Sequence, residues 1–98
     1  MKYNKTPEQF DLDIQKPEFK IFGFLTVDSG ITFKRKDDKL ICSYWRIQPA
    51  FNKLCETSFP FQNIPKTWDE FVKFSNKVID HFQKYSENAL FLIDIYQE

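Results

Sequence analysis

Side chains that commonly perform catalysis or bind metals are few in this chain. His81 is its single histidine, and Cys42 and Cys55 are its two cysteines. There is no Cys-x-x-Cys or His-x-x-x-His spacing, so no metal site is predicted. Asp80 stands next to His81, but adjacent residues of a helix point in different directions and do not converge on one atom.

A Cys–His pair brought together by folding would be the remaining route to nucleophilic catalysis. Cys42 stands among apolar residues of a predicted strand, where a thiol is usually inert. With no convergent set of acid, base and nucleophile, we expect a protein that is not an enzyme and uses no cofactor. Two cysteines are also too few for the disulfide framework of a small secreted domain, so we expect two reduced thiols.

The chain is instead rich in side chains that contact other macromolecules. Aromatic residues make up 18% of its 98 residues, 12 of them Phe, whereas only 2 residues are Gly. So little Gly argues against a phosphate-binding glycine loop. The formal net charge is +0, yet residues 31–53 carry six basic and two acidic side chains.

The elements that position these side chains begin with a three-stranded antiparallel meander over residues 19–47. Three runs of β-branched and aromatic residues are separated by turn sequences around Asp28-Ser29-Gly30 and Asp37-Asp38, a pattern typical of β-hairpins. The three strands are predicted at 19–27, 31–36 and 40–47. The alternating apolar residues of Phe10–Ile14 predict a further strand, ended by Lys16-Pro17.

An amphipathic helix is predicted from Thr67 to about Ser86, because Thr67 and Glu70 form a capping-box sequence and apolar residues follow at helical spacing. Asn88 is a suitable helix end, and the apolar run 89–96 predicts a last strand. The predicted fold is therefore a single α+β domain over residues 1–98. It has a mainly antiparallel sheet of four to five strands with one helix on one face, in the order β-β-β-β-α-β.

Residues 48–66 allow two interpretations. Their prolines interrupt regular structure, and both a helical turn at 50–55 and a short edge strand near 55–59 fit the sequence. Five large apolar side chains in this segment need burial, and the sheet face opposite the helix is the obvious place, so we favour a segment that folds over that face. The alternative is that this second face stays open to a partner.

An open second face would present a partner-binding surface. Aromatic side chains on neighbouring strands would supply the central contacts, and basic side chains would lie at the rim. The predicted contact residues are Phe22, Phe24, Lys34, Tyr44, Trp45 and Arg46. A secondary contact set on the helix is Phe74, His81 and Tyr85, although aromatic residues at that position more often pack against a neighbouring loop.

The favoured function is a small protein–protein interaction module, most concretely an inhibitor or immunity-type protein. The bias of 12 Lys to 2 Arg fits an AT-rich genome and a phage or mobile-element origin. The first alternative is a nucleic-acid-binding accessory protein that uses the basic hairpin 31–47. The second is a homo-oligomer, such as a homodimer, that buries the second face against itself. With no apolar leader and no membrane-spanning run, we expect a cytoplasmic protein that does not enter membranes.

Overall fold

The computed structural model describes the backbone of residues 2–97 and the side chains of residues 2–84. The described chain forms one five-stranded sheet whose strands lie side by side in chain order, each antiparallel to the next. The strands are β1 (Lys2–Tyr3), β2 (Lys20–Thr26), β3 (Ser29–Lys36), β4 (Lys39–Arg46) and β5 (Asn52–Pro60). The predicted α+β class, antiparallel sheet and meander over residues 19–47 are confirmed.

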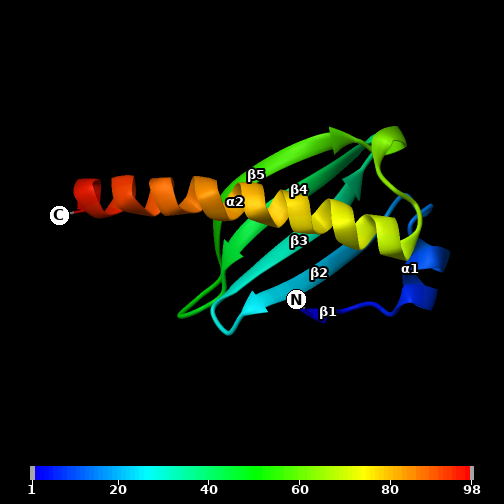
Figure 1. The fold of residues 1–98 in the computed structure, drawn as a ribbon, viewed down its shortest axis with the longest axis horizontal. Helices are drawn as coiled ribbons and strands as arrows, with labels where there is room; N and C mark the ends of the chain where they lie inside the picture. Colours follow the sequence, from blue (N-terminus) through cyan, green and yellow to red (C-terminus); the bar gives the residue numbers. More distant parts are fainter. Residues whose placement is uncertain (1, 98) are drawn as a thin grey trace.

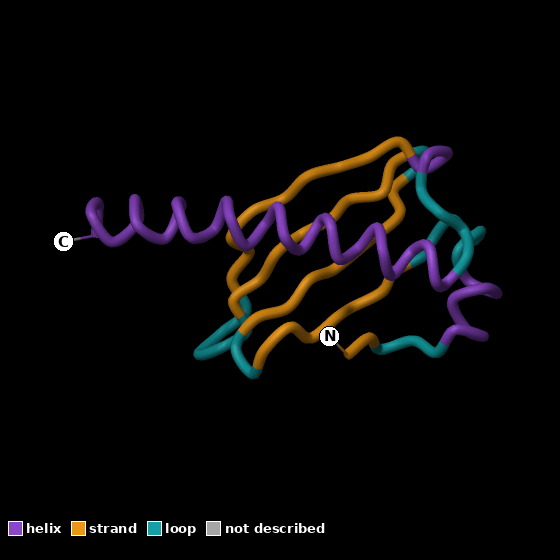
Figure 2. Tube along the Cα trace, in the orientation of Figure 1, coloured by secondary structure: helices purple, strands orange, loops and turns teal. Residues whose placement is uncertain are grey.

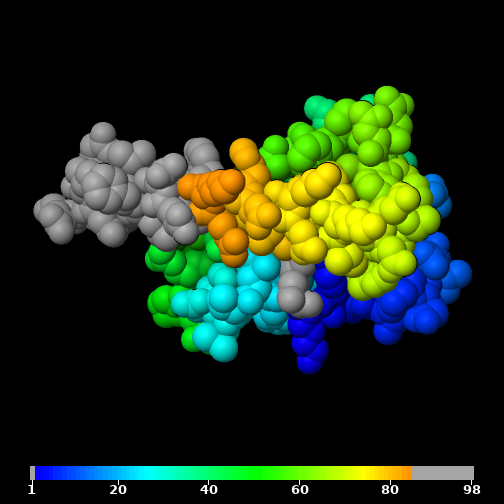
Figure 3. Space-filling view, viewed as in Figure 1, coloured from blue at the N-terminus to red at the C-terminus, as the bar shows by residue number. Residues whose placement is uncertain are grey.

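The long helix α2 (Trp68–Gln97) crosses a single face of this sheet (Figures 1 and 2). The ring of Phe71 lies 5.2 Å from that of Phe33 in β3, and the ring of Phe82 lies 6.0 Å from that of Tyr44 in β4, measured between centroids. In the space-filling view from the same side, the described part of α2 lies over the strands (Figure 3). The core therefore lies between α2 and one face of the sheet.

The predicted strand at 10–14 is wrong, because this segment is the helix α1 (Pro7–Asp13) and its C-cap. Phe10 and Ile14 are buried, at 0% and 1% exposure, while Leu12 between them is 74% exposed. In a strand the three side chains would share one face, whereas in a helix only residues four apart do so. The alternating pattern was therefore compatible with a helix that buries two of its three apolar residues.

A capping box begins α1. The Thr6 hydroxyl accepts a hydrogen bond from the backbone N–H of Gln9, and the Gln9 side chain accepts one from the backbone N–H of Thr6. Pro7 occupies the first helical position, where its missing N–H costs nothing. These signals precede the alternating run and explain why a helix forms here.

Residues 48–66 leave most of the second face of the sheet uncovered; Phe51 is the exception, because its ring lies on that face near Phe22 and Trp45. Residues 52–60 form β5, which pairs with β4 along its length and so extends the sheet sideways. A short 3-10 helix, η1 (Phe61–Asn63), follows and buries Phe61 against the edge of the core. The predicted edge strand is therefore present and longer than expected, and the predicted helical turn at 50–55 is absent.

The long helix begins where the sequence predicts and ends later. Trp68 is its first residue, and the backbone N–H of Phe71 donates to the carbonyl of Thr67. The helix continues through Asn88 to Gln97, so the predicted strand at 89–96 is wrong. No Gly or Pro interrupts this stretch, and a short apolar run does not by itself distinguish a strand from a helix. Within the described residues, no helix is both long and apolar enough to cross a membrane.

Candidate functional site

The sheet face opposite α2, here called the open face, is the candidate site. Because paired residues of adjacent strands point to the same side, the register assigns each side chain to a face. Three rows cross the open face from β2 to β5. They are Phe24–Gly30–Trp45–Lys53, Phe22–Thr32–Ser43–Glu56 and Lys20–Lys34–Ile41–Ser58.

Four aromatic rings gather at one end of the open face. The ring centroid of Phe22 lies 4.6 Å from that of Phe24 and 6.5 Å from that of Phe51. Phe51 also approaches Trp45, with 6.3 Å between centroids. Phe24 is 47% exposed and Phe51 66%, so this aromatic cluster (Phe22, Phe24, Trp45 and Phe51) is accessible from solvent. Together with Asn4, Lys20 and Thr32, it lines a depression of about 490 Å³.

Polar contacts from three strands hold the aromatic cluster in place. The indole N–H of Trp45 donates to Thr32 Oγ1 at 2.8 Å. The backbone N–H of Phe22 donates to Asn4 Oδ1 at 2.9 Å, which fixes the strand that carries the ring. Gly30 lies beneath the Phe22 ring, and a Cβ at this position would come within 2.9 Å of Phe22 Cζ. These contacts therefore fix the positions of the Phe22 and Trp45 rings on the sheet.

Lysines occupy the other end of the open face. Lys20 and Lys34 are register partners, and Lys36 pairs with Lys39 beside the β3–β4 turn. All four are exposed, and no ion pair involving them occurs among the described residues. Lys53 differs, because it forms an ion pair with Glu56 at 2.6 Å. The open face therefore joins an aromatic end to an end rich in unpaired lysines.

The acidic residues that balance these lysines lie mostly on other surfaces. Glu8 and Asp11 belong to α1, and Asp69 and Glu70 to the first turn of α2. The exceptions are Glu56, which lies on the open face, and Asp37 and Asp38 in the β3–β4 turn, which lie between Lys36 and Lys39. The zero net charge of the chain thus conceals an uneven distribution, and the row that holds Lys20 and Lys34 contains no acidic side chain.

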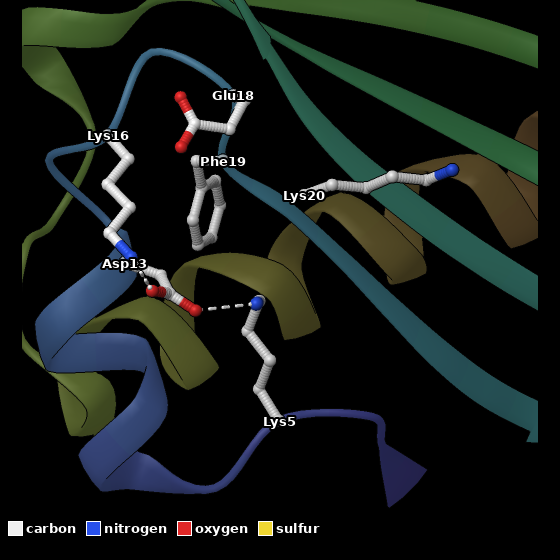
Figure 4. Close-up of a pocket in the computed structure, with 6 residues that line it drawn as sticks. All are labelled: Lys5, Asp13, Lys16, Glu18, Phe19 and Lys20. Carbon is white, nitrogen blue, oxygen red and sulfur yellow. Dashed lines mark hydrogen bonds and ion pairs between the residues drawn. The ribbon is translucent and has the colours of Figure 1, made fainter.

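A second charged cluster, near α1, has a structural role. Asp13 accepts hydrogen bonds from both Lys5 and Lys16 at 2.9 Å and ties α1 to the chain before and after it (Figure 4). These two lysines hold the pKa of the Asp13 carboxyl below its usual value. Glu18 and Phe19 line the same hollow as Lys5, Asp13 and Lys16. The charges of this cluster are largely paired, unlike the lysines of the open face.

Four of the six predicted contact residues, namely Phe22, Phe24, Lys34 and Trp45, lie on the open face. The prediction for Tyr44 is wrong: this side chain is 8% exposed and packs under α2. Arg46 is next to Trp45 in β4 and pairs with Ser29, so it points to the side opposite the indole. Because side chains alternate between the two faces along β4, Tyr44 and Arg46 point to the side opposite Trp45. A prediction that grouped the three residues by their proximity in the sequence ignored this alternation.

The structure adds residues that the sequence-based site lacked. Lys20 shares the open face with Phe22, as their spacing of two in one strand indicates. Phe51, which the sequence predicts to pack over the second face, does lie on that face, where it extends from the β4–β5 connection to the aromatic cluster. Asn4 and Thr32 gave no signal, because their positions depend on the pairing of β1, β2 and β3.

The three residues of the predicted secondary contact set do not form one surface in the part of the chain whose side chains are described. Phe74 packs between Phe33 and Phe59, with centroid distances of 6.3 and 5.2 Å, so it belongs mainly to the core. His81 is exposed and lines a groove of about 420 Å³ between β5 and α2. The side chain of Tyr85 lies outside the described residues.

Cys55 and His81 line the same hollow between β5 and α2, but burial disfavours ionisation of both thiols, those of Cys42 and Cys55. Burial raises the pKa of the Cys42 thiol to about 12, and it also raises the pKa of Cys55, so both favour the neutral thiol. Among the described residues no group of three or more His, Cys, Asp or Glu side chains could hold a metal ion. The open face offers exposed aromatic rings and lysine side chains. None of the protein families, curated proteins or solved structures compared with this chain matches it.

Proposed function

We propose that the protein binds single-stranded nucleic acid on the open face. The observation that carries this proposal is the joining of exposed aromatic rings to unpaired lysines on one uncovered sheet surface. Aromatic side chains that stack on bases, beside cations that contact the phosphates, are the usual means of holding a single strand. Phe22, Trp45 and Phe51 are the base contacts, and Lys20 and Lys34 are the main phosphate contacts.

The kind of cation favours nucleic acid over a protein partner. Lysine is depleted at protein–protein interfaces, whereas arginine is enriched there. Every cationic position in the three rows of the open face is a lysine, and Arg46 points to the other side. A partner that meets this surface should therefore be anionic and should offer flat apolar groups, and a single strand offers both. A duplex offers the charge but hides the faces of its bases.

A protein partner is the second candidate, and it is favoured by the exposed aromatic cluster alone. Rings such as those of Phe24 and Phe51 are common anchors of protein interfaces. An inhibitor or immunity-type role stays a prediction, and the lysines restrict it to an acidic partner surface. The two candidates differ in how their binding responds to salt and in whether a bare oligonucleotide is bound at all.

The test is a fluorescence anisotropy titration of a labelled dT12 strand at several salt concentrations. If Lys20, Lys34, Lys36 and Lys39 each neutralise one phosphate, the slope of log K against log [salt] should be about −2.8, since each contact contributes about 0.7 for single strands. Binding should then weaken by about 50-fold between 50 and 200 mM salt. The corresponding duplex should bind more weakly than the strand.

A matched pair of variants locates the site. The double substitution Lys20→Gln and Lys34→Gln should reduce the magnitude of the slope by about 1.4, because two phosphate contacts are lost. The control, Lys73→Gln with Lys77→Gln, removes the same charge from exposed positions on α2 and should leave the slope unchanged. Absence of dT12 binding at low salt, or equal effects of the two double variants, would contradict the proposal.

A further inference from the structure

The aromatic cluster surrounds the open depression on this face, here called the slot, with rings that stand at steep angles to one another. The rings of Phe22 and Phe24 meet at 74°, those of Phe22 and Phe51 at 66°, and those of Trp45 and Phe51 at 78°. A platform that stacks successive bases needs rings that present their faces in the same direction. Rings at these angles instead enclose a space in which one flat group can lie with its face on one ring and its edges toward the others.

We propose that this slot takes a single unstacked base and that the rest of the strand is held through its phosphates. The inference rests on the proposed function and specifies its ligand. The depression of about 490 Å³ between the rings has room for one base. From Phe24 to Lys20 the strand rise gives about 13 Å, so the lysines lie within a few nucleotides of the slot.

Two polar groups around the slot have a donor that is free for a ligand. Thr32 Oγ1 accepts the indole N–H of Trp45, and its own hydroxyl proton has no acceptor among the described residues. Asn4 Oδ1 accepts the backbone N–H of Phe22, so the side-chain NH2 is the group left for a ligand. A base with carbonyl oxygens on its edge can accept from both donors, whereas an exocyclic amino group can pair only with the lone pair that Thr32 Oγ1 retains and would face the Asn4 NH2 unpaired.

The slot should therefore select keto bases, represented here by thymine, over cytosine and adenine. Cytosine and adenine place an exocyclic amino group where thymine has its O4 carbonyl. A donor that faces another donor loses its partner, and because Asn4 is exposed and Thr32 half-buried, we expect a preference of about 5-fold for thymine, the lower end of the cost of one unsatisfied polar contact.

Three eight-residue strands test the single slot. The first is dT8, the second carries one central thymine among abasic residues, and the third is fully abasic. We expect the first two to bind within about threefold of each other and the third to bind about 5- to 150-fold more weakly, since stacking contributes about 1–3 kcal/mol per base. A single-thymine strand that binds as weakly as the abasic strand, while dT8 binds well, overturns the slot and leaves the proposed function standing. If dT8 itself does not bind, both fail.

Base selection is tested by replacing the single thymine with cytosine, adenine or guanine. Thymine and guanine should bind better than cytosine and adenine, and equal affinities overturn the keto preference. Asn4→Asp replaces the NH2 donor by an acceptor at nearly constant shape and keeps an oxygen for the backbone N–H of Phe22, so it should reduce the ratio of thymine to cytosine affinity. Thr32→Val removes a hydroxyl that can pair with either base and should leave that ratio nearly unchanged, and an equal change in both variants would contradict the assignment of the donor.

Discussion

Tyr44 and Trp45 are neighbours in β4, and their replacement by leucine should affect different properties. Tyr44→Leu should lower the stability of the protein, and Trp45→Leu should lower its affinity for a single strand. Tyr44 is 8% exposed and packs on Phe82 under α2. Loss of a buried ring costs about 3–5 kcal/mol when it is replaced by alanine, and leucine should recover part of this, which leaves about 2–3 kcal/mol. At about 4–8 °C per kcal/mol for a domain of this size, the melting temperature of Tyr44→Leu should fall by roughly 10–20 °C.

Trp45→Leu should be much less destabilising, because the side chain is half-buried and loses one hydrogen bond, to Thr32, worth about 1 kcal/mol. Its affinity for dT12 should fall about 5- to 150-fold, which is the cost of one lost stacking contact. Tyr44→Leu should keep its affinity within about twofold while it is folded.

The assays are thermal unfolding followed by circular dichroism and anisotropy titration of dT12 well below both melting temperatures. The control is the circular dichroism spectrum at that temperature, which should be the same for both variants and the wild type. The assignment of faces would be refuted by a Tyr44→Leu protein that is stable but binds poorly. It would also be refuted by a Trp45→Leu protein that binds as the wild type does.

Three further outcomes are expected. Gly30→Ala should weaken dT12 binding and lower the melting temperature, because its Cβ would lie 2.9 Å from Phe22 Cζ and 3.0 Å from a backbone oxygen; unchanged binding would contradict this. The pKa of Asp13 is lowered by its two lysine partners, so its stabilisation is present above the unfolded value of 3.8 and lost as pH falls through the folded value. Asp13→Asn should therefore lose less stability than the wild type between about pH 5 and pH 2 in acid unfolding curves, and parallel curves would argue against the role. The Cys42 thiol, with a pKa of about 12, should react with iodoacetamide at pH 8 only on unfolding, and fast labelling of the native protein would show an exposed thiolate.

The sequence was sufficient where local signals and long-range packing agree. The meander was predictable because turn residues separate strands that pair with their chain neighbours. The start of α2 was predictable for the same reason: Thr67 precedes an apolar stripe that faces the sheet. In both cases, the residues that determine the element lie within it.

Prediction failed where one pattern suits two structures. Phe10, Leu12 and Ile14 follow one another at a spacing of two, as in a strand, but Phe10 and Ile14 are also four apart, as on one face of a helix; the capping box of Thr6 and Pro7 favour the helix. The run after Asn88 is similarly ambiguous. For residues 52–60 the apolar count suggested a cover over the sheet, but pairing with β4 satisfies the backbone groups of this segment and was not visible in its composition.

The candidate site was predictable as a surface and only partly in its membership. Strand alternation alone places Lys20 with Phe22 and separates Tyr44 from Trp45. The contribution of Phe51 depends on the path of the connection between β4 and β5, for which no local rule exists. The openness of the face depends on where β5 lies, which is a property of the whole sheet.

The agreement between strand order and chain order has a consequence for how the protein folds. Each of the hairpins from β2 to β5 closes over a short loop, so these contacts are local and should form early. Tyr3 is different: its hydroxyl meets Ser75, 72 positions away, and its ring packs against Trp68. Closing so long a loop is entropically expensive until the sheet and α2 already lie together. We therefore expect β1 to attach last and to detach first, so that hydrogen exchange at the edge of β2 next to β1 should be faster than in β3.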